Sequence, residues 1–246
     1  MSFMLPTSAR CPSFARWSRS YGIGSGLVQT LARTLARAVC AASLALVVPA
    51  PAGAADAPVR IVALGDSLTA GFGLPGDAAF PARLQAALRA KGLAVEISNA
   101  GVSGDTSSGG LARLDWSVPD GTDGVIVELG ANDALRGVDP GVTRAALQEL
   151  LRRLKERRIA VLLTGMRAPP NMGADFARAF DAIFPALAAE NEVVFYPFFL
   201  DGVAADRVLN QADGLHPTAQ GVDTIVRRIL PKVEELIARA RARRNS

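Results

Sequence analysis

The chain has 246 residues, half of them hydrophobic and 6% aromatic, which is typical of a globular protein with a sizeable core and argues against disorder. A single histidine excludes sites built from several imidazoles, and two cysteines exclude a disulfide framework or a cysteine-rich zinc module. The formal net charge of +4 arises in residues 1–54, which carry five arginines and no acid. The rest has 22 basic and 23 acidic residues, so charge gives no reason to expect nucleic-acid binding.

Residues 1–54 have the pattern of a secretory signal peptide. A 13-residue apolar run at 38–50 follows the arginine-containing segment. Its length fits the roughly 7–15 residues of a signal peptide and is short of the roughly 20 that span a membrane. Ala52-Gly53-Ala54 offers a cleavage site, with Ala55 and Ala57 as alternatives. We predict cleavage near Ala54, a periplasmic or secreted protein, and one mature domain over 55–246 without stable membrane insertion. An uncleaved N-terminal anchor is the alternative.

Strands and helices are expected to alternate along the mature part. Short apolar runs predict five strands, over 60–64, 95–97, 124–129, 159–164 and 193–196. Longer amphipathic stretches predict four helices, over 81–91, 140–157, 174–190 and 217–239. A Gly/Ser-rich loop is expected over 101–110, a kink at Pro185, a bend at Pro231, and a frayed, solvated Arg-rich end after 239. This alternation predicts an α/β fold with a parallel sheet that binds ligands beyond the carboxyl ends of its strands.

Polar segments follow several of these strands. Gly65-Asp66-Ser67-Leu68 ends the first strand and places Ser67 near the N-terminus of a following helix. Gly130-Ala131-Asn132-Asp133 follows the third strand and offers the Asn132 amide as a donor. Gly104 lies between them, where a glycine lets a backbone N–H approach a ligand closely. Each segment alone also fits an ordinary turn or helix cap.

The only histidine, His216, follows Asp213 by three residues, just before the last predicted helix. In a turn, this spacing can bring the carboxylate against one ring nitrogen and leave the other facing a hydroxyl. Nucleophilic acyl transfer needs a hydroxyl, a base, a group that orients the base, and donors for the oxyanion, and all four are available here. Thr69 replaces the second glycine of a Gly-x-Ser-x-Gly elbow around Ser67, which disfavours the ordinary α/β-hydrolase fold.

These four segments resemble the sequence blocks of the SGNH (GDSL) hydrolase superfamily. Four stretches are similar to its bacterial periplasmic thioesterase I/lysophospholipase L1/arylesterase branch, namely 99–114, 128–135, 196–199 and 213–217. The resemblance covers essentially residues 60–235. It implies a three-layer α/β/α flavodoxin-like fold with a parallel sheet of about five strands.

The resemblance also implies the roles of the site residues. Ser67 would be the nucleophile, His216 the general base and then acid, and Asp213 the carboxylate that orients His216. The oxyanion hole would consist of the backbone N–H groups of Ser67 and Gly104 and the side-chain amide of Asn132. A small ester or thioester is the expected substrate, with an acyl-enzyme on Ser67, no cofactor or metal, and a monomer or weak dimer. The loop over 134–139 would line the acyl groove and move on binding.

Other functions remain open at this point. Residues 71–76 match the G-x-G-x-x-G pattern of dinucleotide-binding oxidoreductases, and Glu96 lies 20 residues beyond Gly76. However, Pro75 interrupts the pattern, and its first glycine lies seven residues after Leu64 instead of in the tight turn that follows the strand. A non-catalytic lipid- or glycan-binding module is a second alternative, because fold does not determine function. Deacetylation of a carbohydrate and acyl transfer to an alcohol are further ones. Four apolar residues are candidates for lining an acyl site, although apolar residues near strand ends more often belong to the core or to a lid: Phe72, Leu135, Met166 and Pro169.

Overall fold

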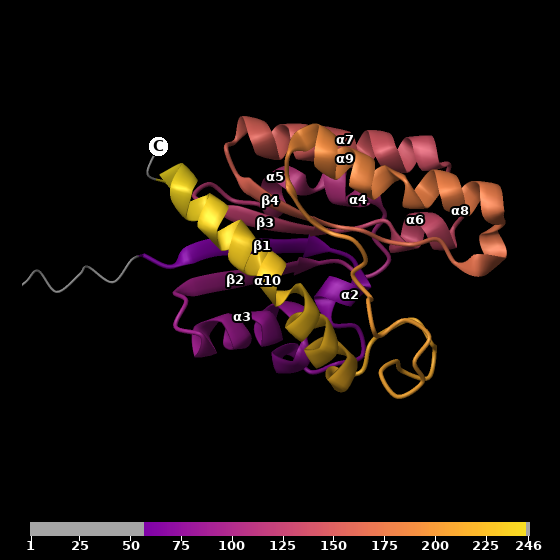
Figure 1. Cartoon of the computed structure of the whole chain (residues 1–246), viewed down its shortest axis with the longest axis horizontal. Coiled ribbons are helices and arrows are strands. Elements are labelled where there is room, and N and C mark those ends of the chain that lie inside the picture. Colours follow the sequence, from indigo (N-terminus) through magenta and orange to yellow (C-terminus); the bar gives the residue numbers. More distant parts are fainter. Residues whose placement is uncertain (1–56, 245–246) are drawn as a thin grey trace, which may run out of the picture. The chain divides into compact units, whose positions relative to one another are not determined.

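The computed structural model describes residues 57–244, in which a five-stranded parallel sheet carries helices on both faces (Figure 1). The predicted signal peptide lies outside the described residues. The strands are β1 (Val59–Gly65), β2 (Val95–Gly101), β3 (Gly124–Glu128), β4 (Ala160–Thr164) and β5 (Val194–Tyr196). Their spatial order, β2-β1-β3-β4-β5, is that of flavodoxin-like folds. The predicted α/β architecture is therefore confirmed.

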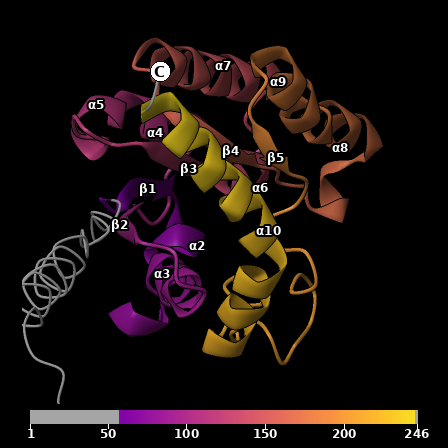
Figure 2. The same cartoon turned by 60° about the vertical axis from the view of Figure 1, so that its left-hand side comes forward.

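Helices cover the sheet in two layers, as Figure 2 shows. On one face, α3 (Phe80–Ala90) and α10 (Ala219–Arg244) pack against each other. The other face carries α4 (Ser107–Ala112), α5 (Leu114–Ser117), α7 (Pro140–Glu156), α8 (Ala174–Asp181) and α9 (Ile183–Asn191). Two short helices, α2 (Ser67–Ala70) and α6 (Ala131–Leu135), directly follow β1 and β3 at the C-terminal edge of the sheet.

The strands in the middle of the sheet are continuous apolar runs because both of their faces are covered. Every residue of β3 and β4 is buried. In the outer layer, α7 turns Leu147, Leu150, Leu151 and Leu154 toward them, each at most 1% exposed. The edge strand β2 differs, since its pairing with β1 continues through the polar residues Ser98 and Asn99 as far as Gly101. The prediction of a strand over 95–97 was therefore too short, because pairing with β1 rather than hydrophobicity extends β2.

Two predicted segments have different structures. The end of the expected loop over 101–110 belongs to α4, which begins at Ser107 and is capped by Thr106, whose Oγ1 accepts from the Gly109 N–H at 3.2 Å. Glycine at 110 lets α4 approach β3 closely, because a Cβ there would lie 2.3 Å from Leu129 Cδ1. The helix predicted over 174–190 is broken at Ala182 rather than kinked, because Pro185 has no N–H to donate to the Asp181 carbonyl.

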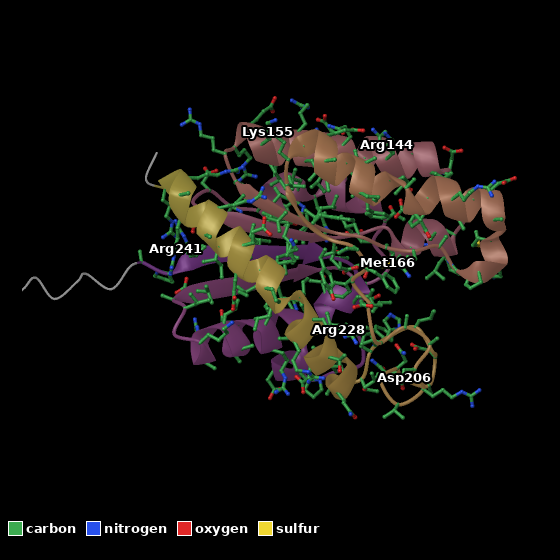
Figure 3. All side chains as sticks on the ribbon, viewed as in Figure 1. Arg144, Lys155, Met166, Asp206, Arg228 and Arg241 are labelled. Carbon is green, nitrogen blue, oxygen red and sulfur yellow. The ribbon has the colours of Figure 1, made fainter. Side chains whose placement is uncertain are left out.

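The last helix also differs from its prediction. It begins at Ala219 and continues to Arg244, past the predicted end at 239, with Pro231 inside it. The expectation of a frayed end is wrong, because the terminal arginines bind the N-terminal edge of the sheet. Arg244 donates to the Pro58 carbonyl at 2.7 Å and to Asp123 Oδ1 at 2.6 Å. Arg241 marks this end of α10 in Figure 3, away from the edge that carries α2 and α6.

Candidate active site

The C-terminal edge of the sheet brings the predicted site residues together. This follows from the fold, because the carboxyl ends of parallel strands meet at one edge. Met166, two residues beyond β4, marks this edge in Figure 3. The site residues come from four segments: Ser67 opens α2 after β1, Gly104 lies in the turn after β2, Asn132 is in α6 after β3, and Asp213 and His216 lie in the turn before α10.

A hydrogen-bonded series joins a hydroxyl, an imidazole and a carboxylate. Ser67 Oγ lies 2.9 Å from His216 Nε2, and His216 Nδ1 lies 2.6 Å from Asp213 Oδ2. Asp213 Oδ1 accepts from the backbone N–H groups of His216 at 3.0 Å and Leu215 at 2.9 Å. The His216 N–H, followed by the His216 ring and the Leu215 N–H, lowers the pKa of Asp213 to about 2. An ionised carboxylate only accepts, so Nδ1 carries the ring proton and Nε2 is free to accept from Ser67.

The glycine-rich segment 71–76 lies beside this series. The Phe72 ring packs on the His216 ring with centroids 4.4 Å apart. The Phe72 carbonyl accepts from Gln211 Nε2 at 2.8 Å, which fixes the segment to the turn that carries His216. The segment is separated from β1 by α2, and α2 is the helix that opens directly after the strand. This arrangement disagrees with the dinucleotide-binding alternative, whose glycines must lie in the turn between strand and helix.

Ser67 is held by a tight turn between β1 and α2. As the first residue of α2 it has a backbone N–H outside the intrahelical hydrogen bonds. Asp66 caps the helix, since its Oδ1 accepts from the Leu68 N–H at 2.9 Å. Gly65 has no room for a side chain, because a Cβ would lie 2.1 Å from Thr69 Oγ1 and 2.6 Å from Glu128 Oε2. The GDSL segment thus turns around the buried carboxyl group of Glu128, which accepts from the Asp66 N–H and from Thr69 Oγ1 and was not predicted.

The predicted oxyanion donors lie next to this turn. Gly104 has a φ of +83°, and within residues 57–244 its backbone N–H has no hydrogen-bond partner. Asn132 Nδ2 donates to the Asp105 carbonyl at 2.9 Å, which places the amide beside Gly104, and to Asp66 Oδ2 at 3.1 Å. Both amide hydrogens of Asn132 are therefore used in hydrogen bonds. An oxyanion that binds this amide has to share or replace its longer bond, the one to Asp66 Oδ2.

A buried arginine connects the strand ends around the site. Arg113 donates to Asp105 Oδ2 at 2.6 Å, to the Ala100 carbonyl at 2.9 Å and to the Gly65 carbonyl at 2.8 Å. It therefore ties the ends of β1 and β2 to the residue after Gly104. The sequence gives no signal for this role, because an arginine in an amphipathic stretch is usually solvated.

Ser67, Asn132 and His216 line a cavity of about 220 Å³. Its other walls are mostly apolar and are formed by Leu68, Ala131, Leu135, Met166, Arg167, Pro169, Leu200 and Leu215. Three of the four candidate lining residues are among them, whereas Phe72 packs on His216 instead. Arg167 is the one charged residue of this lining, and its guanidinium lies 4.8 Å from the Phe198 ring centroid.

The described part of the chain brings together no cluster of three His, Cys, Asp or Glu residues that could hold a metal ion. Within the same residues, no helix has both the length and the apolar character needed to cross a membrane.

Known proteins are similar to this chain in sequence and fold. Residues 63–223 match the GDSL-like Lipase/Acylhydrolase family. Esterase TesA of Pseudomonas aeruginosa is 35% identical over 178 residues, which are 72% of this chain and 89% of that protein. Thioesterase 1/protease 1/lysophospholipase L1 of Escherichia coli is 41% identical over 68% of this chain and 77% of its own length. The crystal structure of AlinE4, an SGNH-hydrolase family esterase, superposes on this chain with a TM-score of 0.62. The two sequences are 46% identical, and the match covers 72% of this chain and 96% of AlinE4. The chain therefore belongs to the GDSL-like lipase/acylhydrolase family of SGNH hydrolases, whose members cleave ester bonds.

Proposed function

We propose that this chain is a serine esterase that hydrolyses carboxylic esters or thioesters through an acyl-enzyme on Ser67. The observation that carries the proposal is the series from Ser67 Oγ through His216 to Asp213, with links of 2.9 and 2.6 Å, beside an apolar cavity. The names of the relatives, an esterase and a thioesterase/lysophospholipase, agree with this chemistry.

The geometry supports a two-step reaction. His216 Nε2 takes the proton of Ser67 as its oxygen attacks the substrate carbonyl, and Asp213 stabilises the imidazolium that forms. The imidazolium then gives this proton to the leaving alcohol or thiol, and the acyl group stays on Ser67. Water then attacks the acyl carbonyl as His216 takes its proton. The imidazolium returns this proton to the Ser67 oxygen as the acyl–oxygen bond breaks, and the carboxylic acid leaves.

Asn132→Ala tests the oxyanion role of the amide. We expect a loss of roughly 10²–10³ in kcat with little change in KM, since such a donor acts mainly in the transition state. Steady-state kinetics on one ester at saturating substrate measures both parameters. Because Asn132 also donates to Asp66 and Asp105, circular dichroism must show that the variant is folded. A folded variant with wild-type kcat would contradict the role.

Hydrolysis of p-nitrophenyl esters from acetyl to palmitoyl tests the function and the acyl preference. A cavity of about 220 Å³ is smaller than the roughly 300–1,000 Å³ of pockets that enclose drug-sized ligands. We therefore expect kcat/KM to be highest for short acyl groups and to fall toward palmitoyl. Ser67→Ala is the blank, and the protein carries no histidine tag because free imidazoles hydrolyse such esters slowly. No turnover above the blank at any length would favour a carbohydrate O-acetyl esterase or a non-catalytic binding module.

We also propose that residues 1–54 export the enzyme to the periplasm. The proposal rests on the apolar run and on the Ala52-Gly53-Ala54 segment. N-terminal sequencing of the protein from a periplasmic extract tests it, with a mature start near Ala55 as the expected result. A mature chain that begins well before residue 50 would contradict cleavage at this site.

A further inference from the structure

Two carboxyl groups without a cationic partner lie beneath the nucleophile turn. Asp66 immediately precedes Ser67, and Glu128 is the last residue of β3. Both are 0% exposed. Within the described residues neither forms a salt bridge. The reaction proposed above uses neither group directly, so their burial at this place needs another explanation.

The hydrogen bonds of the pair leave one oxygen without a donor. Asp66 Oδ1 accepts from the Leu68 N–H, and Asp66 Oδ2 accepts from Asn132 Nδ2. Glu128 Oε2 accepts from Thr69 Oγ1 at 2.8 Å and from the Asp66 N–H at 3.3 Å. Glu128 Oε1 is buried, and no donor among the described residues reaches it. An unpaired carboxylate oxygen is costly in this position, whereas a protonated carboxyl is itself a donor.

The electrostatics of the pair favour one retained proton. Burial, followed by the negative charge of Asp66, raises the pKa of Glu128 well above its ordinary value. Burial raises the pKa of Asp66 to about 6, although the Leu68 N–H and a hydrogen bond from Glu128 act against it. One titratable group and one charged group face the pair: His216, which lowers the pKa of Asp66, and Arg113, which donates to the neighbouring Gly65 carbonyl. Two carboxylates that share one buried site, without a salt-bridge partner, do not readily both ionise.

We propose that Asp66 and Glu128 form a buried acid pair that holds one proton, with neutral Glu128 as donor and ionised Asp66 as acceptor. In this state Asp66 accepts from Asn132 and caps α2, so the pair positions two of the proposed oxyanion donors, the Asn132 amide and the Ser67 N–H. The shared proton also keeps the charge behind the oxyanion at one unit instead of two. Glu128 is thus a positioning residue, and this catalytic part rests on the proposed esterase function.

The pH dependence of stability tests the retained proton. Unfolding exposes Glu128 to water, where its pKa returns to about 4.5. The folded state keeps the proton, so wild-type stability falls as the pH rises above that value, toward the raised pKa of the folded state. Glu128→Gln keeps a neutral donor and has no proton to lose. The ratio of the variant's folding equilibrium constant to that of the wild type should therefore rise between pH 5 and 8, by up to about tenfold per pH unit.

Glu149→Gln is the matched control. Arg152 and Arg153 lower the pKa of Glu149, on the exposed side of α7, to about 2. Its titration therefore affects stability only between about 2 and 4.5, and the ratio for this variant should be flat from pH 5 to 8. Measuring all variants in a Ser67→Ala background separates the result from catalysis. A flat ratio for Glu128→Gln as well would overturn the proposal.

Infrared spectroscopy and kinetics complete the test. The difference spectrum of wild type minus Glu128→Gln at pH 7 should contain the C=O stretch of a protonated carboxylic acid, and carboxylate bands alone would overturn the proposal.

Glu128→Gln should retain most of kcat, whereas a folded Glu128→Leu should lose roughly 10² in kcat with little change in KM. An equally large loss in a folded Glu128→Gln would overturn the positioning role. Absence of esterase activity in the wild type would contradict the proposed function and leave the stability result unaffected.

Discussion

Ser67→Ala is expected to lower kcat by roughly 10⁴- to 10⁶-fold. The variant removes the oxygen that carries the acyl group in the proposed mechanism, while His216, Asp213 and the proposed oxyanion donors remain. Its fold should persist, because the lost contact is one hydrogen bond from a small side chain to His216 Nε2. Such a bond contributes about 1 kcal/mol to stability. Release of p-nitrophenol from a short-chain ester measures the loss.

A neighbouring serine provides the control for this prediction. Ser108 is exposed in α4, and Ser108→Ala should keep wild-type turnover. A phosphonate ester that labels wild type and Ser108→Ala, but not Ser67→Ala, would identify the nucleophile independently of turnover. Wild-type turnover in a folded Ser67→Ala would refute the assignment of Ser67.

The sequence predicts those parts of the fold whose signal is local. The strands β1, β3 and β4 agree with their predictions within one residue at either end, because strands buried on both faces are continuous apolar runs. The length of β2 depends on its pairing with β1, and the docking of Arg244 depends on the N-terminal edge of the sheet. Neither contact leaves a periodic pattern in the chain, so both segments were predicted incorrectly.

The candidate site also combines residues that the local sequence predicts with residues that it does not. Ser67, Asn132 and His216 lie in short polar segments at strand ends or before a helix, where topology alone brings them to one edge. The groups that support them interact over longer distances in sequence: Glu128 contacts the turn 62 residues before it, and Arg113 reaches back 48 residues to Gly65. One signal was available for Glu128, since it is the only acid in the buried run over 124–129.

Asp213→Asn is expected to lower kcat by roughly 10⁴-fold, more than Asp213→Ala. In the wild type, Asp213 Oδ1 accepts from the backbone N–H groups of Leu215 and His216, and Oδ2 faces His216 Nδ1. An asparagine must keep its oxygen toward the two N–H groups, because its NH₂ group cannot accept. The NH₂ group then faces Nδ1 and forces the ring proton onto Nε2, where it prevents His216 from taking the proton of Ser67. Alanine imposes no tautomer and leaves room for water.

Kinetics of the two Asp213 variants between pH 5 and 9 test this mechanism. The pKa of Asp213 is lowered from 3.8 to about 2, so the carboxylate is ionised over this whole range and its own titration adds no pH dependence. Below this range, the stability that Asp213 contributes is present above pH 3.8 and is lost as the pH falls toward 2. Equal losses in the two variants would show that orientation of the ring matters and that the tautomer does not. A smaller loss for asparagine would mean that its amide turns its oxygen toward Nδ1, against the two backbone N–H groups.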